Sequence, residues 1–248
     1  MLVLSSVVAG AQPRDAQAHN VLTAAERVAG WRLLFDGRTL NGWHGLGHAK
    51  LPAGLWVVED GAIKHLEKRS GLVQADGQPL TGFDLISDSS YRNFELSWEW
   101  KIAPAGNSGV KYNVSETLST SMDPAHAAKG WEYQIIDDER NEDNTLASHR
   151  SGALYDLIAP NDRKTGTTVA DQWQRSRIVF RGDHGEHWLN GVKVVEFDIG
   201  TPAFDSAFAK SKYAKYPEWF PVRRSGQIVL QDHDAVVWYR DIKIRVEK

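Results

Sequence analysis

The sequence predicts an all-β protein, a sandwich of two antiparallel sheets of the jelly-roll type. About a dozen short runs have the composition of strands, and Gly, Asn, Asp and Pro separate them. Patterns with the period of a helix are scarce, and no spacing suggests βαβ units. A chain of 248 residues with this pattern is long enough for one large sandwich. We therefore expect a single jelly-roll domain over residues 30–248.

The residues before this domain, 1–29, carry no strand pattern. The first eleven, MLVLSSVVAGA, are apolar and small and end in an Ala-Gly-Ala that suits signal-peptide cleavage, but they lack a basic start and are too short to span a bilayer. We interpret them as the remnant of an export signal and expect a periplasmic or extracellular protein; a flexible N-terminus is the alternative. A polar linker follows, and then a short helix with Thr23 as its N-cap and Gly30 as its stop.

Strand signals begin at Trp31 and recur to the end of the chain. Asn190-Gly191 separates two of them and predicts a type I′ hairpin, because these residues tolerate the two positive φ angles. Residues 200–225, rich in Phe, Tyr, Lys and Pro, form a long insertion, and loops of this length are usually functional or disordered. The expected strands are Trp31–Phe35, Leu55–Val58, Ala62–His65, Leu85–Ser87, Phe94–Ile102, Gly109–Val114, Trp131–Ile136, Ala153–Leu157, Gln174–Phe180, Glu186–Leu189, Val192–Phe197, Gln227–Gln231 and Val236–Val246.

Composition and absent motifs narrow the ligand class. The net charge is −3 and no Lys/Arg cluster occurs, which argues against nucleic acid as a partner. The absence of cysteine rules out a disulfide framework and a thiol nucleophile. No apolar run has membrane length, and no phosphate-binding loop, dinucleotide fingerprint, serine-hydrolase motif or His-Glu-x-x-His occurs, so we expect no nucleotide cofactor. Ten Trp residues fit either a β-rich core or a surface that stacks on flat ligands, and the absent motifs leave a carbohydrate as the default ligand class.

The stretch WEYQIIDDE at 131–139 is the strongest candidate for a site. Trp131, Tyr133 and Ile135 alternate as a buried strand face would, which places Glu132 and Gln134 together on the opposite face. Asp137 joins that face only if a bulge intervenes near 135–136. Laminarinase-type jelly rolls carry a similar Glu-x-Asp-x-x-Glu array, but here the middle residue is Gln and the last is Asp. This weakens a two-carboxylate mechanism and keeps the geometry of a sugar cleft. A solvated edge strand is the alternative.

Polar residues of other predicted strands extend this site. Lys111 and Asn113 share a face in GNSGVKYNV, and Asn107 is either a turn former or a ligand contact. Gln231 and His233 lie at the end of a core strand.

The loop after the acidic strand adds His149, Arg150 and Tyr155. Histidine is the one side chain whose ordinary pKa lies near neutrality, which makes His149 and His233 candidate bases; surface-loop positions are the alternative. His187, before the Asn-Gly turn, is expected on the hairpin surface.

Several stretches together resemble the bacterial 3-keto-disaccharide hydrolase family. They occur in order over residues 30–246. The stretches are GWRLLFDGRTLNGWHG (30–45), WVVEDGAI (56–63), YRNFELSWEWKIAPAGNSGVKYNV (91–114), WEYQIIDDE (131–139), GALYDLIAP (152–160), HWLNGVKVVEFD (187–198) and GQIVLQDHDAVVWYRDIKIR (226–245).

The resemblance implies a concanavalin-like (glucanase-like) jelly roll, export, and action on glycosides oxidised at C3, by hydrolysis or by elimination. Similar sequences often place His-Pro-Asp after the acidic strand, where this chain has Asn141-Glu142-Asp143. A role of that histidine is therefore not carried over to this chain.

We hypothesise cleavage of a 3-keto-glycoside that begins with removal of the acidic C2 proton. His149 or His233 is the expected base, Lys111, Arg150 or a metal stabilises the enolate, and Glu132 orients the substrate or acts as the acid. A divalent metal ion would be held by Asp137 and Asp138, with Glu132 or His149, because oxygen-rich sites with imidazole suit several ions. Gln134, Asn107, Asn113, Arg150, Tyr155 and Gln231 are the expected substrate contacts. Two alternatives stay open: a non-catalytic carbohydrate-binding module, and a retaining glycoside hydrolase with Glu132 and Asp137 as its pair.

Overall fold

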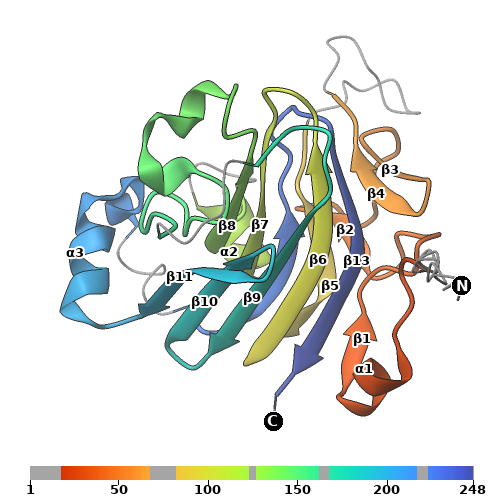
Figure 1. The fold of residues 1–248 in the computed structure, drawn as a ribbon, viewed down its shortest axis with the longest axis horizontal. Coiled ribbons are helices and arrows are strands. Elements are labelled where there is room, and N and C mark those ends of the chain that lie inside the picture. Colours follow the sequence, from red (N-terminus) through yellow and green to blue (C-terminus); the bar gives the residue numbers. More distant parts are fainter. Residues whose placement is uncertain (1–17, 68–81, 123–126, 162–167, 217–222, 248) are drawn as a thin grey trace, which may run out of the picture.

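The computed structural model describes residues 18–67, 82–122, 127–161, 168–216 and 223–247. Within these residues, two antiparallel sheets lie face to face (Figure 1). The strands of the larger sheet are β1 (Trp31–Leu33), β3 (Trp56–Glu59), β4 (Ala62–His65), β6 (Phe94–Ile102), β9 (Gln174–Arg181), β10 (His184–Leu189), β11 (Val192–Asp198) and β13 (Val237–Val246). The strands of the smaller sheet are β2 (Trp43–Gly45), β5 (Leu85–Tyr91), β7 (Asn107–Val114), β8 (Trp131–Ile136) and β12 (Gly226–Leu230).

The strand order confirms the predicted two-sheet sandwich. The eight-stranded sheet has the order β11-β10-β9-β6-β13-β4-β3, with β1 paired to β13, and the five-stranded sheet has the order β2-β5-β12-β7-β8. The last strand of the chain, β13, therefore lies inside the larger sheet, between β6 and β4.

Short helices surround the sheets. They are α1 (Ala24–Val28), α2 (Glu116–Ser121), α3 (Pro202–Lys210) and the 3₁₀ turns η1 (Glu142–Thr145), η2 (Ala147–His149) and η3 (Lys212–Lys215). The predicted N-cap of α1 is confirmed, because Thr23 and Glu26 form a reciprocal capping box. No helix in the described part of the chain has the length and apolar character needed to cross a membrane.

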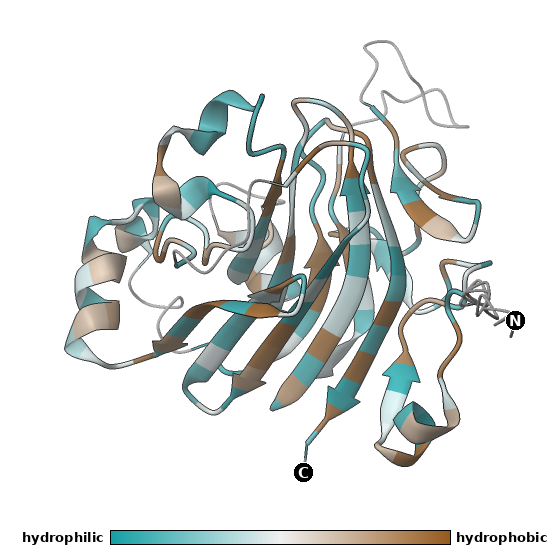
Figure 2. Cartoon of the chain, in the orientation of Figure 1, coloured by the Kyte–Doolittle hydropathy of each residue, from teal (hydrophilic) through white to brown (hydrophobic). Residues whose placement is uncertain are grey.

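Aromatic side chains fill the space between the sheets. Period-two alternation places one face of each strand there, and Figure 2 shows the alternating brown and teal bands along the second half of β13. Trp98 of β6 and Tyr133 of β8 meet edge to face, with ring centroids 5.0 Å apart. Such a pair contributes about 0.5–1.5 kcal/mol beyond its buried area. Trp100, Tyr112 and Trp131 are also fully buried in this core.

The Asn-Gly hairpin is confirmed, but His187 does not lie on its surface. Asn190 and Gly191 both have positive φ, and β10 pairs with β11 across them. His187 is instead completely buried: its Nδ1–H donates to the carbonyl of Gly152, and its Nε2 accepts from the Tyr112 hydroxyl at 2.9 Å. Burial lowers the pKa of His187 to about 4.

Three local predictions differ from the structure. Residues 153–157 form no strand, because Leu154 makes only isolated bridges and Asp156 has a positive φ that turns the chain. The short strand β2 and the helix α2 were not predicted, since each is only three to six residues long. The insertion at 200–225 is not irregular in its described part, because it contains α3 and η3.

Candidate functional site

The outward face of the smaller sheet carries a row of side chains across three strands. Lys111 of β7 pairs with Glu132 of β8, and Val229 of β12 pairs with Lys111 on the other side. Trp131, Tyr133 and Ile135 point into the core, so the alternation predicted along residues 131–135 is observed.

Glu132 and Lys111 form an ion pair in this row. Lys111 Nζ lies 3.7 Å from Glu132 Oε2, and both side chains are largely buried. Burial by itself lowers the pKa of Lys111, but the carboxylates of Glu132 and Asp84 outweigh it and raise the pKa above its ordinary value. The ammonium therefore keeps its charge. A Cβ on Gly109 would lie 2.5 Å from Glu132 Oε1, so only glycine leaves room for this carboxylate.

Asp84 is a further member of the site that sequence reasoning missed. It is buried, and burial raises its pKa to about 6 although Lys111 opposes the shift. Its Oδ1 accepts a hydrogen bond from the backbone N–H of Asp232 at 2.9 Å. Asp84 is two residues before Ile86, whose pairing partner is Val229 in the Glu132 row. Strand phase was therefore the signal that could have found it.

A cavity of about 270 Å³ opens over Glu132 and Lys111. We call it the lysine cavity. The smaller sheet, the segment before β8 and the turn η3 supply its walls. Its lining residues are Lys111, Ala127, Ala128, Lys129, Glu132, Lys212, Tyr213, Lys215, Tyr216 and Gln231.

The predicted amide contacts are not gathered in one cavity. Gln231 lines the lysine cavity, and its buried Oε1 has no hydrogen-bond partner in the described structure. Gln134 donates from Nε2 to Asn107 Oδ1 at 3.2 Å, which leaves its own Oε1 without a partner among the described residues. Asn107 and the exposed His233 line a separate cavity of about 340 Å³. The structure therefore does not place His233 beside Glu132 in one cavity.

His149 does not have the environment of a neutral base. Its Nδ1–H donates to Asp143 at 2.8 Å and its Nε2–H donates to Asp156 at 2.9 Å. Burial works to lower the pKa of His149, but these two hydrogen bonds outweigh it and raise the pKa above 6.5. Both carboxylates favour the protonated imidazole, which argues against the expected role of His149 as a neutral base. The ring stacks on Tyr155, whose hydroxyl donates to Asp143 at 2.9 Å.

Asn113 and Arg150 also differ from their predicted positions. Asn113 has a positive φ at an irregularity in the β7–β12 pairing, which removes it from the face of Lys111. Its side chain is fully buried, and both of its polar atoms are without partners in the described part of the chain. Arg150 is exposed and lines none of the cavities seen in that part.

Asp137 and Asp138 do not fit a metal site. The β7–β8 ladder runs without a register shift, so Asp137 does not join the face of Glu132. Asp137 Oδ2 accepts from the Ala105 N–H, and the two oxygens of Asp138 accept from the N–H groups of Ser151 and Thr168. Because N–H donors already occupy these oxygens, the two carboxylates anchor loops.

Two other groups have ligand atoms close enough to hold a metal ion. They are His19, Glu99 and Asp241, and His184, Glu186 and Glu196. Neither includes a predicted ligand. Lys193 already pairs with both Glu186 and Glu196, and Arg175 and Arg240 pair with Glu99.

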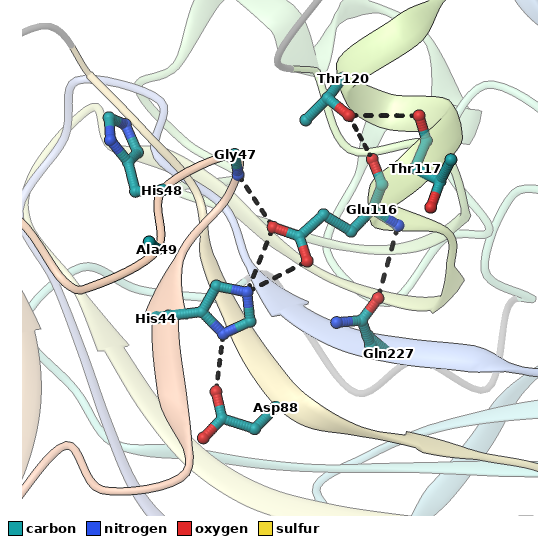
Figure 3. Close-up of a pocket in the computed structure, with 9 residues that line it drawn as sticks. All are labelled: His44, Gly47, His48, Ala49, Asp88, Glu116, Thr117, Thr120 and Gln227. Carbon is teal, nitrogen blue, oxygen red and sulfur yellow. Dashed lines mark hydrogen bonds and ion pairs between the residues drawn. The ribbon is translucent and has the colours of Figure 1, made fainter.

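A second polar cluster lies on β2, β5 and α2, in an open cavity of about 760 Å³ (Figure 3). His44 donates to Asp88 at 2.6 Å and to Glu116 at 3.1 Å. Glu116 also accepts from the Gly47 N–H at 3.0 Å. These contacts join α2 to the edge of the smaller sheet. Burial works to lower the pKa of His44, but its two carboxylate partners outweigh it and raise the pKa.

Comparison with protein families gives a match over most of the chain. The model of the 3-keto-alpha-glucoside-1,2-lyase-like domain matches residues 30–245. A 3-keto-disaccharide hydrolase of Bacteroides thetaiotaomicron is 32% identical over 237 residues, which cover 88% of this chain and 78% of that protein.

Solved structures agree with the fold. A candidate glycosyl hydrolase of Parabacteroides distasonis superposes with a TM-score of 0.77 and 27% identity, over 93% of this chain and all of that one. The catalytic domain of a laminarinase from Thermotoga petrophila superposes with a TM-score of 0.50 and 11% identity, over 88% of this chain and 98% of that one. The second likeness shows the fold alone, and it confirms the glucanase-like jelly roll predicted from the sequence.

Proposed function

Because the chain belongs to the family of the 3-keto-alpha-glucoside-1,2-lyase-like domain, we propose that it cleaves the glycosidic bond of a 3-keto-glycoside. The relative from Bacteroides thetaiotaomicron is named a 3-keto-disaccharide hydrolase and covers most of this chain. The observation that carries the proposal is the Glu132–Lys111 ion pair on the floor of the lysine cavity. A carboxylate beside an ammonium, both shielded from water, suits removal of a proton next to a ketone.

The chemistry begins at the carbon next to the ketone. Glu132 takes the C2 proton, and the electrons of the C2–H bond move to the C3 oxygen as an enolate. Lys111 is the nearest described cation to Glu132, and it stabilises this negative charge. When the carbonyl at C3 reforms, the electrons form a C1–C2 double bond and the bond from C1 to the leaving oxygen breaks. Addition of a solvent water across the new double bond gives net hydrolysis.

Lys212 is the candidate acid for the leaving oxygen. It lines the same cavity, and its ammonium lies 4.2 Å from the ring centre of Tyr155. Partial removal of water lowers the pKa of Lys212, which makes the ammonium a better proton donor. In our proposal, Glu132 takes the place of His149 as the base, because both nitrogens of His149 donate to carboxylates.

A conventional retaining mechanism with Glu132 and Asp137 has less support. Asp137 is fully buried and is bonded to the Ala105 N–H and to Arg140. It does not line the lysine cavity. A nucleophile must reach C1 of the sugar, and Asp137 has no such access in the described structure.

The proposed reaction is tested by changing the oxidation state of the substrate at C3. A glucoside and its 3-keto derivative, with the same aglycone, are incubated with the protein, and the released aglycone is measured. We expect release from the keto compound alone. Release from both compounds would support the retaining hydrolase, and binding of sugar without release from either would support a carbohydrate-binding module.

We also propose that the protein is exported. The support is the apolar MLVLSSVVAGA segment, which lies outside the described residues. Cell fractionation and N-terminal sequencing check this: we expect the protein in the periplasm or the medium, cleaved near residue 11. Full-length protein in the cytoplasm would contradict it.

A further inference from the structure

The lysine cavity has a charge opposite in sign to that of the whole chain. Four ammonium groups line it, from Lys111, Lys129, Lys212 and Lys215, against the single carboxylate of Glu132. The chain as a whole has a net charge of −3. Like charges around one small cavity repel each other, so the arrangement favours an anion inside.

The proposed reaction uses only part of this positive charge. Lys111 is paired with Glu132, and Lys212 is the candidate acid. Lys129 and Lys215 also line the cavity and have no role in the proposed reaction. They come from the segment before β8 and from η3, outside the sheet that holds Glu132. The Lys129 ammonium lies 5.5 Å from the ring centre of Tyr216, which also lines the cavity, so these two segments meet at its wall.

The lining residues point to a carboxylate and not to a phosphate. Phosphate sites in proteins favour arginine forks and helix N-termini. No arginine lines this cavity in the described part of the chain, and the helical N-terminus that does line it belongs to η3, a 3₁₀ turn of only four residues. Lysines act as point charges, and with the tyrosines Tyr213 and Tyr216 beside them they suit a singly charged group on an organic ring.

We infer that the lysine cavity selects 3-keto-glycosides whose leaving group carries a carboxylate, held by Lys215 and Lys129. This inference rests on the proposed function and names the substrate class within it. The sugar ring then lies against Glu132 and Lys111, and the charged end of the leaving group lies toward η3.

A matched pair of substrates tests the inference. They are the 3-keto-glucosides of 4-hydroxyphenylacetate and of its primary amide, which have nearly the same shape and differ in charge. We expect kcat/KM to be about tenfold higher for the carboxylate, which corresponds to one partly shielded ion pair. High salt should reduce this ratio. Equal kcat/KM for the two compounds would overturn the inference while leaving the proposed reaction intact.

Lys215→Gln identifies the source of the preference. Lys215 is exposed, so its replacement should not affect folding. We expect the ratio of kcat/KM for carboxylate over amide to fall toward one. Lys210→Gln is the matched control, because Lys210 is an exposed lysine at the end of α3 and does not line the cavity. An unchanged ratio in Lys215→Gln would contradict the assignment.

A binding measurement separates the two proposals. Titration calorimetry with free 4-hydroxyphenylacetate and with its amide requires no turnover. If wild-type protein cleaves neither glycoside, the proposed reaction fails, but tighter binding of the carboxylate that is lost in Lys215→Gln still supports the anion site. Equal binding of the two compounds would remove it.

Discussion

The ammonium of Lys111 lies 3.7 Å from the Glu132 carboxylate, across adjacent strands of the smaller sheet. Both groups are shielded from water, where charges interact more strongly than on a surface. In our proposal, Glu132 of this pair is the base and Lys111 is the cation that stabilises the enolate.

Glu132→Gln should lower kcat on a 3-keto-glycoside by on the order of 10²–10⁴. The amide has the same shape but cannot accept the C2 proton. We expect the melting temperature to stay within a few degrees of wild type. Glu142→Gln, in the exposed part of the same acidic segment, is the control and should keep full activity. Normal activity per folded molecule in Glu132→Gln would show that the carboxylate is only structural.

Gly109→Ala should displace the Glu132 carboxylate, because the new Cβ would meet Oε1 at 2.5 Å. A displacement of about 1 Å can reduce the rate by on the order of 10²-fold. The measurement is a double-mutant cycle on kcat/KM with Glu132→Gln. We expect Gly109→Ala to have little further effect in the Glu132→Gln background. Fully additive losses would mean that Gly109 acts through another residue.

Asp84→Asn should stabilise the protein above pH 6. The folded-state pKa of Asp84 is about 6, above its ordinary value of 3.8, so the folded state binds the proton more tightly and loses stability as pH rises between these two values. Each pKa unit corresponds to about 1.4 kcal/mol, so the gain approaches about 3 kcal/mol at most. Chemical denaturation of both proteins at pH 4 and pH 7 measures it. If the difference in free energy of unfolding between Asp84→Asn and wild type does not grow with pH, the prediction is wrong.

His187 should make the free energy of unfolding fall as pH is lowered, which is opposite to the effect of Asp84. Its folded-state pKa of about 4 lies below 6.5, so its contribution is complete above pH 6.5 and is lost as pH falls toward 4. His187→Gln should be less stable than wild type at pH 7, since it loses packing and the Tyr112 contact. The difference should shrink by up to about 3 kcal/mol at pH 4. Parallel stability curves for the two proteins would show that His187 does not titrate.

Deuterium at C2 of the substrate should reveal the proton transfer. If removal of this proton limits the rate, the labelled compound reacts more slowly; if removal is fast and reversible, the label exchanges into solvent. Mass spectrometry of recovered substrate and product measures both. Retention of the label with no rate effect would rule out C2 deprotonation and favour direct displacement at C1.

The local part of the site could be predicted from sequence. Period-two alternation is a property of one strand, so Trp131 and Glu132 could be assigned to opposite faces without knowledge of the fold. The pairing of Glu132 with Lys111 could be predicted from the sequence only in part, because it depends on which strands are neighbours and on their register.

Contacts between distant segments could not be predicted in this way. Asp84 approaches Lys111 because β12 lies between β5 and β7 in the sheet, although β12 follows both of these strands in the sequence. The two carboxylates on His149 depend on the turns η1 and η2 and on the reversal at Asp156. Lys212 reaches the cavity from an insertion whose composition does not indicate where it packs.

The position of β13 has a consequence for how the chain is made. This strand follows β1, β4 and β6 in the sequence, yet it pairs with all three of them in the larger sheet. Until it emerges, β6 and β4 each expose an open edge that attracts other strands. A polypeptide that terminates early therefore cannot close its sheet and is left open to aggregation and proteolysis. Synthesis of this ten-residue strand is thereby a condition for a closed larger sheet.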